Sequence, residues 1–171
     1  MENSKIAKTF KEIGNLLEID EANHFRVLAY RNAAEIIKSY GREIEAIYNQ
    51  DPKKLKEIPG IGPDLQSKIE ELIKTDKCQY HQRLLQKYGQ GIIDIFSVRG
   101  LGPKKVKLFY QKLKIDNLKK LKKAARTGEI SKLPHMGKKS EQEILKALEE
   151  KQKLSHRLLL SEALPIAEEI V

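Results

Sequence analysis

Cysteine is nearly absent from this chain, which has one, Cys78, among its 171 residues. A single cysteine excludes an internal disulfide and every metal site built from paired cysteines. The four histidines are not paired at a spacing typical of metal ligands, so we expect them to be solvated or hydrogen-bonded. No apolar run approaches the roughly 20 residues that cross a bilayer, and the first residues lack the apolar core of a signal peptide. We therefore expect a cytoplasmic protein without a membrane partner.

Glycine and proline are also scarce, with 10 and 6 residues, whereas 40% of the residues are hydrophobic and 33% are charged. This composition favours a folded, mostly helical protein over a disordered chain. Apolar residues recur at helical spacing along most of the sequence, and no alternating stretch is long enough to predict a strand. The sequence therefore predicts an all-α fold, long enough for one larger domain or two small ones.

The segment EANHFRVLAYRNAAEIIKSYG, residues 21–41, illustrates this helical spacing. Apolar residues recur along it every three or four positions, which predicts a helix with one face in the core. The predicted inner face consists of Phe25, Leu28, Ala29, Ala33, Ile36 and Ile37.

Basic residues outnumber acidic ones, 33 to 24, which gives the chain a formal net charge of +9. Much of this excess lies between Arg99 and Arg126, where eleven lysines and arginines accompany a single acid, Asp116. A cationic surface of this kind favours a polyanionic partner, nucleic acid before membrane. If these cations follow a phosphate backbone, affinity should fall steeply with salt.

One short pattern occurs three times, as PGIGPDLQSKI at 59–69, RGLGPKKVKLF at 99–109 and PHMGKKSEQEI at 134–144. In each copy an apolar residue precedes a glycine, and another apolar residue follows that glycine seven positions later. This is the helix-hairpin-helix pattern. Glycine permits the positive φ of a tight turn, and the exposed N–H groups that begin the second helix can approach a phosphate. Because no side chain reads a base, such a motif binds the DNA backbone without sequence preference.

The hairpins therefore predict contacts to a DNA backbone. The expected contact residues are Gly60, Gly62, Gly100, Gly102, Lys104, Lys105 and Gly137. In the third copy His135 stands where glycine is expected, so we expect this hairpin to serve structure more than phosphate binding. The simpler alternative is a glycine that ends one helix before the next begins.

Three longer segments, FRVLAYRNAAEII, KEIPGIGPDLQSKIEELI and SVRGLGPKKVKLFYQKL, resemble in order and spacing the N-terminal portion of family X DNA polymerases. Two further segments, ISKLPHMGKKSEQEIL and RLLLSEALPIAEEI, look especially like the bacterial or archaeal members of this family. The resemblance implies a small helical lyase-type domain at residues 1–88 and a second helix-hairpin-helix subdomain at 89–151. A helical tail at 152–171 would lead toward a palm domain, whose metal-binding aspartates this sequence lacks. The resemblance therefore implies no polymerase activity in this chain.

The resemblance implies a second activity, removal of a 5′-deoxyribose phosphate during base excision repair. In the family a lysine amine attacks the C1′ aldehyde to form a Schiff base, and β-elimination then releases the sugar phosphate. The resemblance places this lysine at Lys68. Comparison of the repeats also singles out Lys68, because Leu108 and Glu143 occupy the same position in the other hairpins. The hairpin fold by itself therefore does not require a lysine there.

The resemblance further places 5′-phosphate ligands at Arg26, Tyr30 and Lys56, and a ring that stacks on a template base at Phe25. Two cations and a phenol would bind the phosphate and, through repulsion between cations, favour a neutral amine nearby. Tyr30 could equally be a core aromatic residue with a buried hydroxyl partner. Asp64 stands where the best-studied member of the family has a second phosphate-contacting lysine. Its carboxylate would repel the phosphate, although an acid also suits a helix N-terminus.

The resemblance also implies a Na⁺ or K⁺ ion on hairpin carbonyls, and no cofactor that the lyase requires. The carbonyls are those of Lys56, Ile58 and Ile61, and of Phe96, Val98 and Leu101. Our leading hypothesis is a nucleoid-associated protein that recognises gapped, nicked or single-strand-containing DNA at a 5′-phosphate and acts as a lyase. One alternative is a non-catalytic module that tethers a separate polymerase or repair nuclease to DNA. Another is a protein-interaction domain whose hairpins are only structural.

Overall fold

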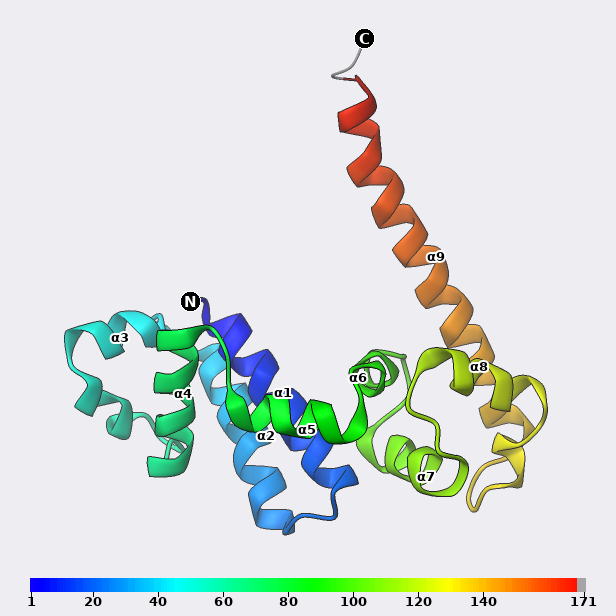
Figure 1. Cartoon of the computed structure of the whole chain (residues 1–171), viewed down its shortest axis with the longest axis horizontal. Coiled ribbons are helices and arrows are strands. Elements are labelled where there is room, and N and C mark those ends of the chain that lie inside the picture. Colours follow the sequence, from blue (N-terminus) through cyan, green and yellow to red (C-terminus); the bar gives the residue numbers. More distant parts are fainter. Residues whose placement is uncertain (169–171) are drawn as a thin grey trace. The chain divides into compact units, whose positions relative to one another are not determined.

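The computed structural model describes the backbone of residues 1–168 and the side chains of residues 1–155. Within this range the chain is helical and has no strand, which confirms the predicted all-α fold. In order, the helices are α1 (Asn3–Ile19), α2 (His24–Ser39), α3 (Ile44–Gln50), the 3₁₀ helix η1 (Pro52–Glu57), α4 (Pro63–Thr75), α5 (Gln79–Tyr88), α6 (Gly91–Phe96), α7 (Pro103–Leu113), α8 (Leu118–Arg126), the 3₁₀ helix η2 (Ile130–Lys132) and α9 (Lys138–Glu168) (Figure 1).

The chain divides into two compact units, Met1–Gln90 and Gly91–Val171. The segment predicted as a tail at 152–171 continues α9 as far as the described backbone extends. None of the described helices is both long enough and apolar enough to cross a membrane.

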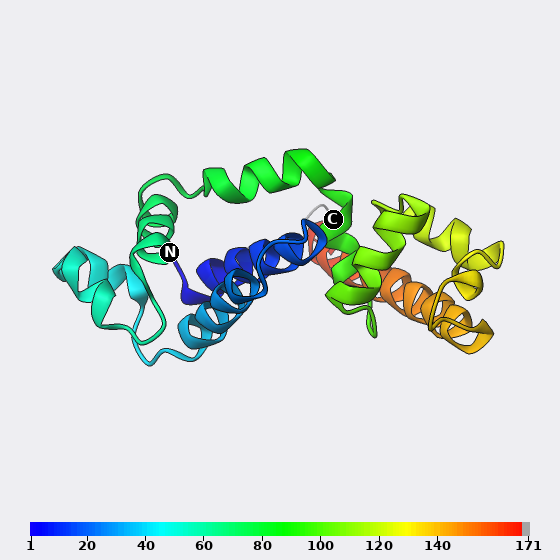
Figure 2. The same ribbon diagram turned by 90° about the horizontal axis from the view of Figure 1, so that it is seen from below.

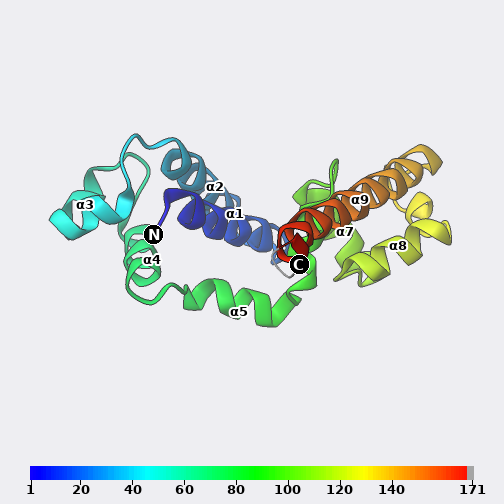
Figure 3. The same ribbon diagram turned by 90° about the horizontal axis from the view of Figure 1, so that it is seen from above.

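In the first unit, α1 lies beside both α2 and α5 (Figure 2, Figure 3). Apolar residues at helical spacing give α1 a continuous buried face that includes Ile6, Phe10, Ile13 and Leu17. Burying four such side chains contributes roughly 1.5–3 kcal/mol each to folding. The packing of α1 thus forms the support on which α2 and α5 are placed.

The buried face of α2 differs in part from the predicted one. Ala33 and Ile37 are buried as expected, but Phe25, Leu28 and Ala29 are exposed. The core-facing residues of this helix are Val27, Tyr30, Ala33, Ala34 and Ile37. The prediction was wrong because it centred the apolar stripe on Phe25 and Leu28 and left out Val27, Tyr30 and Ala34, which are buried together with Ala33 and Ile37. Including Tyr30 rotates the stripe and turns Phe25 toward solvent.

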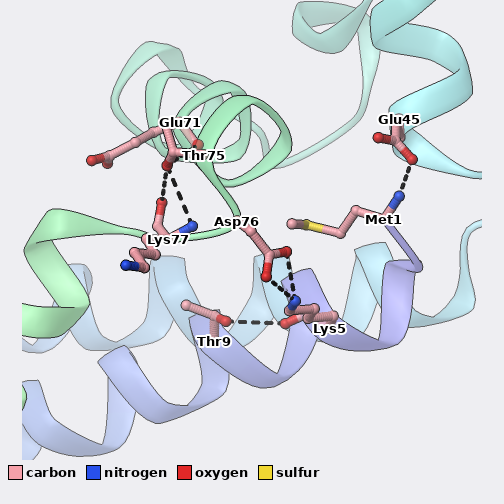
Figure 4. A network of polar contacts seen from close by, with 8 residues as sticks. All are labelled: Met1, Lys5, Thr9, Glu45, Glu71, Thr75, Asp76 and Lys77. Atoms are coloured by element: carbon pink, nitrogen blue, oxygen red, sulfur yellow. Dashed lines mark hydrogen bonds and ion pairs between the residues drawn. The ribbon is translucent and has the colours of Figure 1, made fainter.

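Polar contacts tie the start of α1 to α3 and to the end of α4 (Figure 4). Lys5 Nζ lies 2.5 Å from both carboxylate oxygens of Asp76, and the amino group of Met1 pairs with Glu45. Asn3 is buried, and its side-chain oxygen accepts a hydrogen bond of 2.8 Å from the N–H of Ile44. Asn3 thereby satisfies an N–H in the first turn of α3 that has no partner within that helix. These contacts hold α3 and α4 against α1.

Helix α5 is fixed at two points along the first unit. In its first turns, His81 Nε2 lies 2.9 Å from Glu12 Oε2 of α1. At its end, Lys87 Nζ and the Tyr88 hydroxyl both contact the carboxylate of Asp20, just after α1. These contacts set which face of α5 is turned toward α2 and α4.

In the second unit, α8 packs against α6, η2 and α9. The buried side chains of this unit come from every one of its helices, and they include Ile92, Ile95, Val106, Phe109, Leu121, Ile130 and Ile144. Figure 1 shows that α9 continues well past α8.

The three repeated segments form hairpins of the same backbone geometry. In each, the N–H of the apolar residue between the two turn positions donates to the carbonyl three residues earlier. These pairs are Ile61 with Ile58, Leu101 with Val98, and Met136 with Leu133, each at 3.1 Å. The residue before each donor has positive φ: +78° at Gly60, +81° at Gly100 and +59° at His135. The third hairpin therefore keeps the fold of the other two with a histidine in the left-handed region.

We expect His135→Gly to stabilise the second unit by about 0.5 kcal/mol, because relief of left-handed strain outweighs the greater chain entropy of glycine. The reverse change at the matching position, Gly100→Ala, should destabilise it by about 1 kcal/mol. Urea unfolding, with the midpoint and slope compared between variants, measures both. A His135→Gly variant that is less stable than the original chain would show that the imidazole itself supports the hairpin.

Candidate functional site

The candidate site is built around the first turns of α4. Gly62 precedes this helix in extended backbone, and Pro63 and Asp64 begin it. An acid in the first turn interacts favourably with the helix dipole. One turn later Lys68 lies on the same face, and its Nζ is 2.5 Å from Asp64 Oδ1. The Lys68 side chain is only 14% exposed, whereas that of Asp64 is 67% exposed. The carboxylate thus lies on the open side of the pair.

Tyr80 of α5 lies beside this ion pair and is surrounded by cations. Lys68 Nζ is 5.4 Å from the centre of its ring, and Arg26 Cζ of α2 is 5.0 Å away. Arg83, one turn further along α5, is 6.0 Å from the same ring. A ring attracts cations at such distances through its quadrupole. Three helices therefore bring three cations to one aromatic side chain.

Tyr30 joins this cluster to the core. It is 1% exposed, packs edge-on against Phe10 at 5.5 Å and stacks on Tyr80 at 6.2 Å. Its hydroxyl donates to Asp64 Oδ2 at 3.4 Å. The structure therefore has the arrangement of a core aromatic residue with a hydroxyl partner. In this conformation the hydroxyl meets Asp64 rather than solvent.

The environment shifts the pKa values of these acids and phenols in different directions. The hydrogen bond from Lys68 lowers the pKa of Asp64, so this carboxyl group is ionised at neutral pH. Burial raises the pKa of the Tyr30 hydroxyl, and the neighbouring Asp64 charge raises it further. Burial likewise raises the pKa of Tyr80. The site at neutral pH thus has one carboxylate and two protonated phenols.

The structure brings some of the predicted site residues together and separates others. Arg26, Tyr30 and Lys68 meet around Tyr80. Lys56 lies exposed in the last turn of η1, and none of the contacts found among the described residues joins it to that group. Phe25 is 78% exposed next to Arg26, so its ring is free to stack on a partner.

Sequence reasoning missed Tyr80 and Arg83. Their spacing in QYHQRLLQKY, three residues apart on an amphipathic helix, indicates that they share a face. This spacing does not predict which residues the shared face contacts. Only the packing of α5 against α1 and α2 places it over Lys68.

The glycines that precede α4, α7 and α9 lie in open space. Among the residues that the structure describes, a Cβ atom built at Gly62, Gly102 or Gly137 meets no atom within 4 Å, and none of the three has positive φ. Neither backbone conformation nor internal packing therefore requires glycine at these positions. Without a side chain, the N–H groups that begin each helix remain open to an external anion.

The second hairpin lies at the start of the basic segment. Lys104 is exposed in the first turn of α7, and Lys105 Nζ donates to the Gly100 carbonyl at 3.2 Å. Asp116, the one acid of this segment, is paired with Lys120 at 2.6 Å. The second hairpin thus has two lysines at the start of α7, and the one acid of the basic segment is already paired.

Some of the carbonyls proposed to hold a monovalent cation take part in the hairpin turns. Ile58 and Val98 each accept one hydrogen bond, from Ile61 and Leu101. A carbonyl oxygen has two lone pairs, so one remains on each for another partner. Neutral oxygens of this kind fit a hard cation such as Na⁺ or K⁺.

Comparison with known proteins agrees with this architecture. Residues 1–78 match the family described as a helix-hairpin-helix domain, and residues 92–150 match a SAM-like helix-hairpin-helix tandem. The chain is 30% identical over 170 residues to the DNA polymerase/3'-5' exonuclease PolX of Bacillus subtilis (strain 168). This alignment covers 99% of the chain and 29% of that relative. The chain thus contains helix-hairpin-helix domains in tandem, and its resemblance to family X DNA polymerases is confirmed.

Proposed function

We propose that this chain binds gapped or nicked DNA through the backbone of its hairpins. The observation that carries this proposal is the set of glycines before α4, α7 and α9, where nothing in the described part of the chain requires glycine. A phosphate at these helix starts would accept hydrogen bonds from the exposed N–H groups and would be stabilised by the helix dipole. The basic segment from Arg99 to Arg126 adds contacts to the backbone that are independent of sequence.

The cluster around Tyr80 is the proposed 5′-phosphate site. Arg26, Lys68 and Arg83 place three cations there, and an arginine binds a phosphate through two parallel hydrogen bonds. Lys56, which is exposed in the last turn of η1, would add a contact to the DNA backbone. Phe25 would stack on an unpaired template base beside the site.

The proposed reaction is removal of a 5′-deoxyribose phosphate, as part of base excision repair. Lys68 would form the Schiff base with C1′, and β-elimination would then break the bond between C3′ and its oxygen. Lys68 is the partly buried lysine of the cluster, so its Nζ is held in place rather than free to move. A Na⁺ or K⁺ ion on the hairpin carbonyls would supply only positive charge beside a DNA phosphate.

The test is a binding measurement on a one-nucleotide gap that carries either a 5′-phosphate or a 5′-hydroxyl group. We expect about tenfold tighter binding to the phosphate, because hydrogen bonds to a charged group contribute roughly 1.5–3 kcal/mol. Arg26→Gln should remove this preference and leave binding to the hydroxyl substrate unchanged. Arg42→Gln is the matched control, since Arg42 lies away from the cluster and contacts Gln50. Equal affinity of the original chain for both gaps would refute the 5′-phosphate site.

A non-catalytic module that tethers a polymerase or nuclease to DNA is the second candidate. The close pairing of Lys68 with Asp64 favours it, because the carboxylate stabilises the ammonium form of Lys68, which is not a nucleophile until it loses a proton. Tight, salt-sensitive binding to the gap without any covalent intermediate would identify this function.

A further inference from the structure

We infer that Asp64 is a catalytic residue of the proposed lyase, acting as the proton acceptor that makes Lys68 a nucleophile and then takes the C2′ proton. This inference rests on the proposed function. It assigns a role to the residue at which the chain departs from the best-studied family X polymerase.

The first requirement is a base in contact with Lys68. Imine formation needs the neutral amine, so the ammonium group must give up a proton before it attacks an aldehyde. Asp64 Oδ1 lies 2.5 Å from Lys68 Nζ, within the range of a direct proton transfer. Asp64 is also the more exposed partner, so its carboxylate is on the side from which a sugar would enter.

The other groups around Lys68 are poor acceptors. Tyr30 and Tyr80 remain protonated at neutral pH because burial raises the pKa of both hydroxyls. Arg26 and Arg83 have no acceptor atom. Asp20, the other carboxylate near Tyr80, is held by Lys87 and Tyr88. Among these groups, Asp64 is the one base in contact with Lys68.

The proton and electron balance of the reaction closes with Asp64 alone. Asp64 takes a proton from the ammonium, the amine attacks C1′, and the aldehyde oxygen becomes the hydroxyl of a carbinolamine. Asp64 returns its proton to that hydroxyl, which leaves as water and gives an iminium ion beside a restored carboxylate. The carboxylate then takes the C2′ proton, and the C2′–H electron pair forms a double bond while the C3′–O pair leaves with the DNA 5′-phosphate. Water finally hydrolyses the iminium ion and frees Lys68 in its ammonium form, while Asp64 releases the C2′ proton to the departing phosphate.

Geometry also supports the second proton transfer. C2′ lies two bonds from the imine nitrogen, and the imine nitrogen is the Lys68 Nζ that already contacts the carboxylate. The Tyr30 hydroxyl donates to the other carboxylate oxygen, Oδ2. This leaves Oδ1 directed at the reacting atoms and restricts rotation of the carboxyl group.

Asp64→Asn separates this role from simple repulsion of the phosphate. If Asp64 only repels the phosphate, the variant should bind a 5′-phosphate gap more tightly and be trapped by borohydride at least as fast. If Asp64 is the base, the variant should bind as tightly or more tightly, yet be trapped about 10²–10⁴-fold more slowly, the usual contribution of a general base. Release of the 5′-phosphorylated strand should slow by at least the same factor.

Glu70→Gln is the matched control, because Glu70 also pairs with a lysine one turn later on α4, with Glu70 Oε2 and Lys74 Nζ 3.9 Å apart. It should leave trapping unchanged, and Asp64→Glu should restore part of the rate. An Asp64→Asn variant trapped as fast as the original chain would overturn the inference and leave the lyase intact. An original chain that binds the gap but is never trapped would overturn the lyase and the inference together.

Discussion

Lys68→Ala is expected to abolish the covalent adduct that borohydride traps between this chain and a gapped duplex bearing a 5′-deoxyribose phosphate. No other lysine of the described chain lies against Tyr80 with Arg26 and Arg83 beside it. Without its amine no imine forms at this site, so adduct formation should fall at least about a hundredfold. Denaturing gel electrophoresis after borohydride treatment measures the yield directly.

The Lys68→Arg variant distinguishes loss of the amine nucleophile from loss of the positive charge. A guanidinium group keeps the positive charge but does not act as an amine nucleophile, so DNA binding should persist while the adduct disappears. Lys74→Ala is the control, because Lys74 lies on the same helix with its side chain 60% exposed and should be dispensable. An adduct that survives in Lys68→Ala would assign the chemistry to another lysine.

Gly62→Ala and Gly102→Ala are expected to weaken DNA binding sharply without weakening the fold. The added methyl group meets no atom of the described residues within 4 Å, and neither glycine has positive φ. The methyl would, however, keep a phosphate from the N–H groups of α4 or α7. Loss of hydrogen bonds to a charged phosphate, roughly 1.5–3 kcal/mol, corresponds to about 10–100-fold weaker binding for each variant.

Fluorescence anisotropy at several salt concentrations tests this prediction. Each variant should leave the slope of log affinity against log salt nearly unchanged, because the substitution removes neutral N–H contacts and no cation. Gly41→Ala is the matched control, since Gly41 has the same open surroundings but lies outside the hairpins. Unchanged affinity in Gly62→Ala and Gly102→Ala would mean that the hairpin starts do not hold phosphates.

The hairpins show what this sequence determined by itself. Their features are local: a turn residue of positive φ, an apolar residue that follows it, and a buried residue two helical turns later. Ile69, Phe109 and Ile144 are all buried, as their spacing predicts. Because neighbours in sequence fix a tight turn, pattern alone located three hairpins, including the one with His135.

Tertiary structure decided the surroundings of Lys68. Pattern assigned Phe25 to the core of α2, but the packing of Tyr30 against Phe10 turns Phe25 to solvent. Tyr80 and Arg83 lie on a different helix from Lys68, so spacing along the sequence does not predict that they meet. Contacts of α5 with Glu12 and Asp20 bring them next to Lys68.

The physical reason for this division is the range of the interactions. Backbone dihedral preferences and the spacing of apolar residues act over a few positions, so the sequence alone determined the helices and their hairpins. A cluster of charges and rings needs three helices packed at fixed rotations, and those rotations depend on the fit of whole buried faces. Hence the sequence could place Asp64 and Lys68 on one helix, whereas only the folded chain could set Tyr30 and Tyr80 around them.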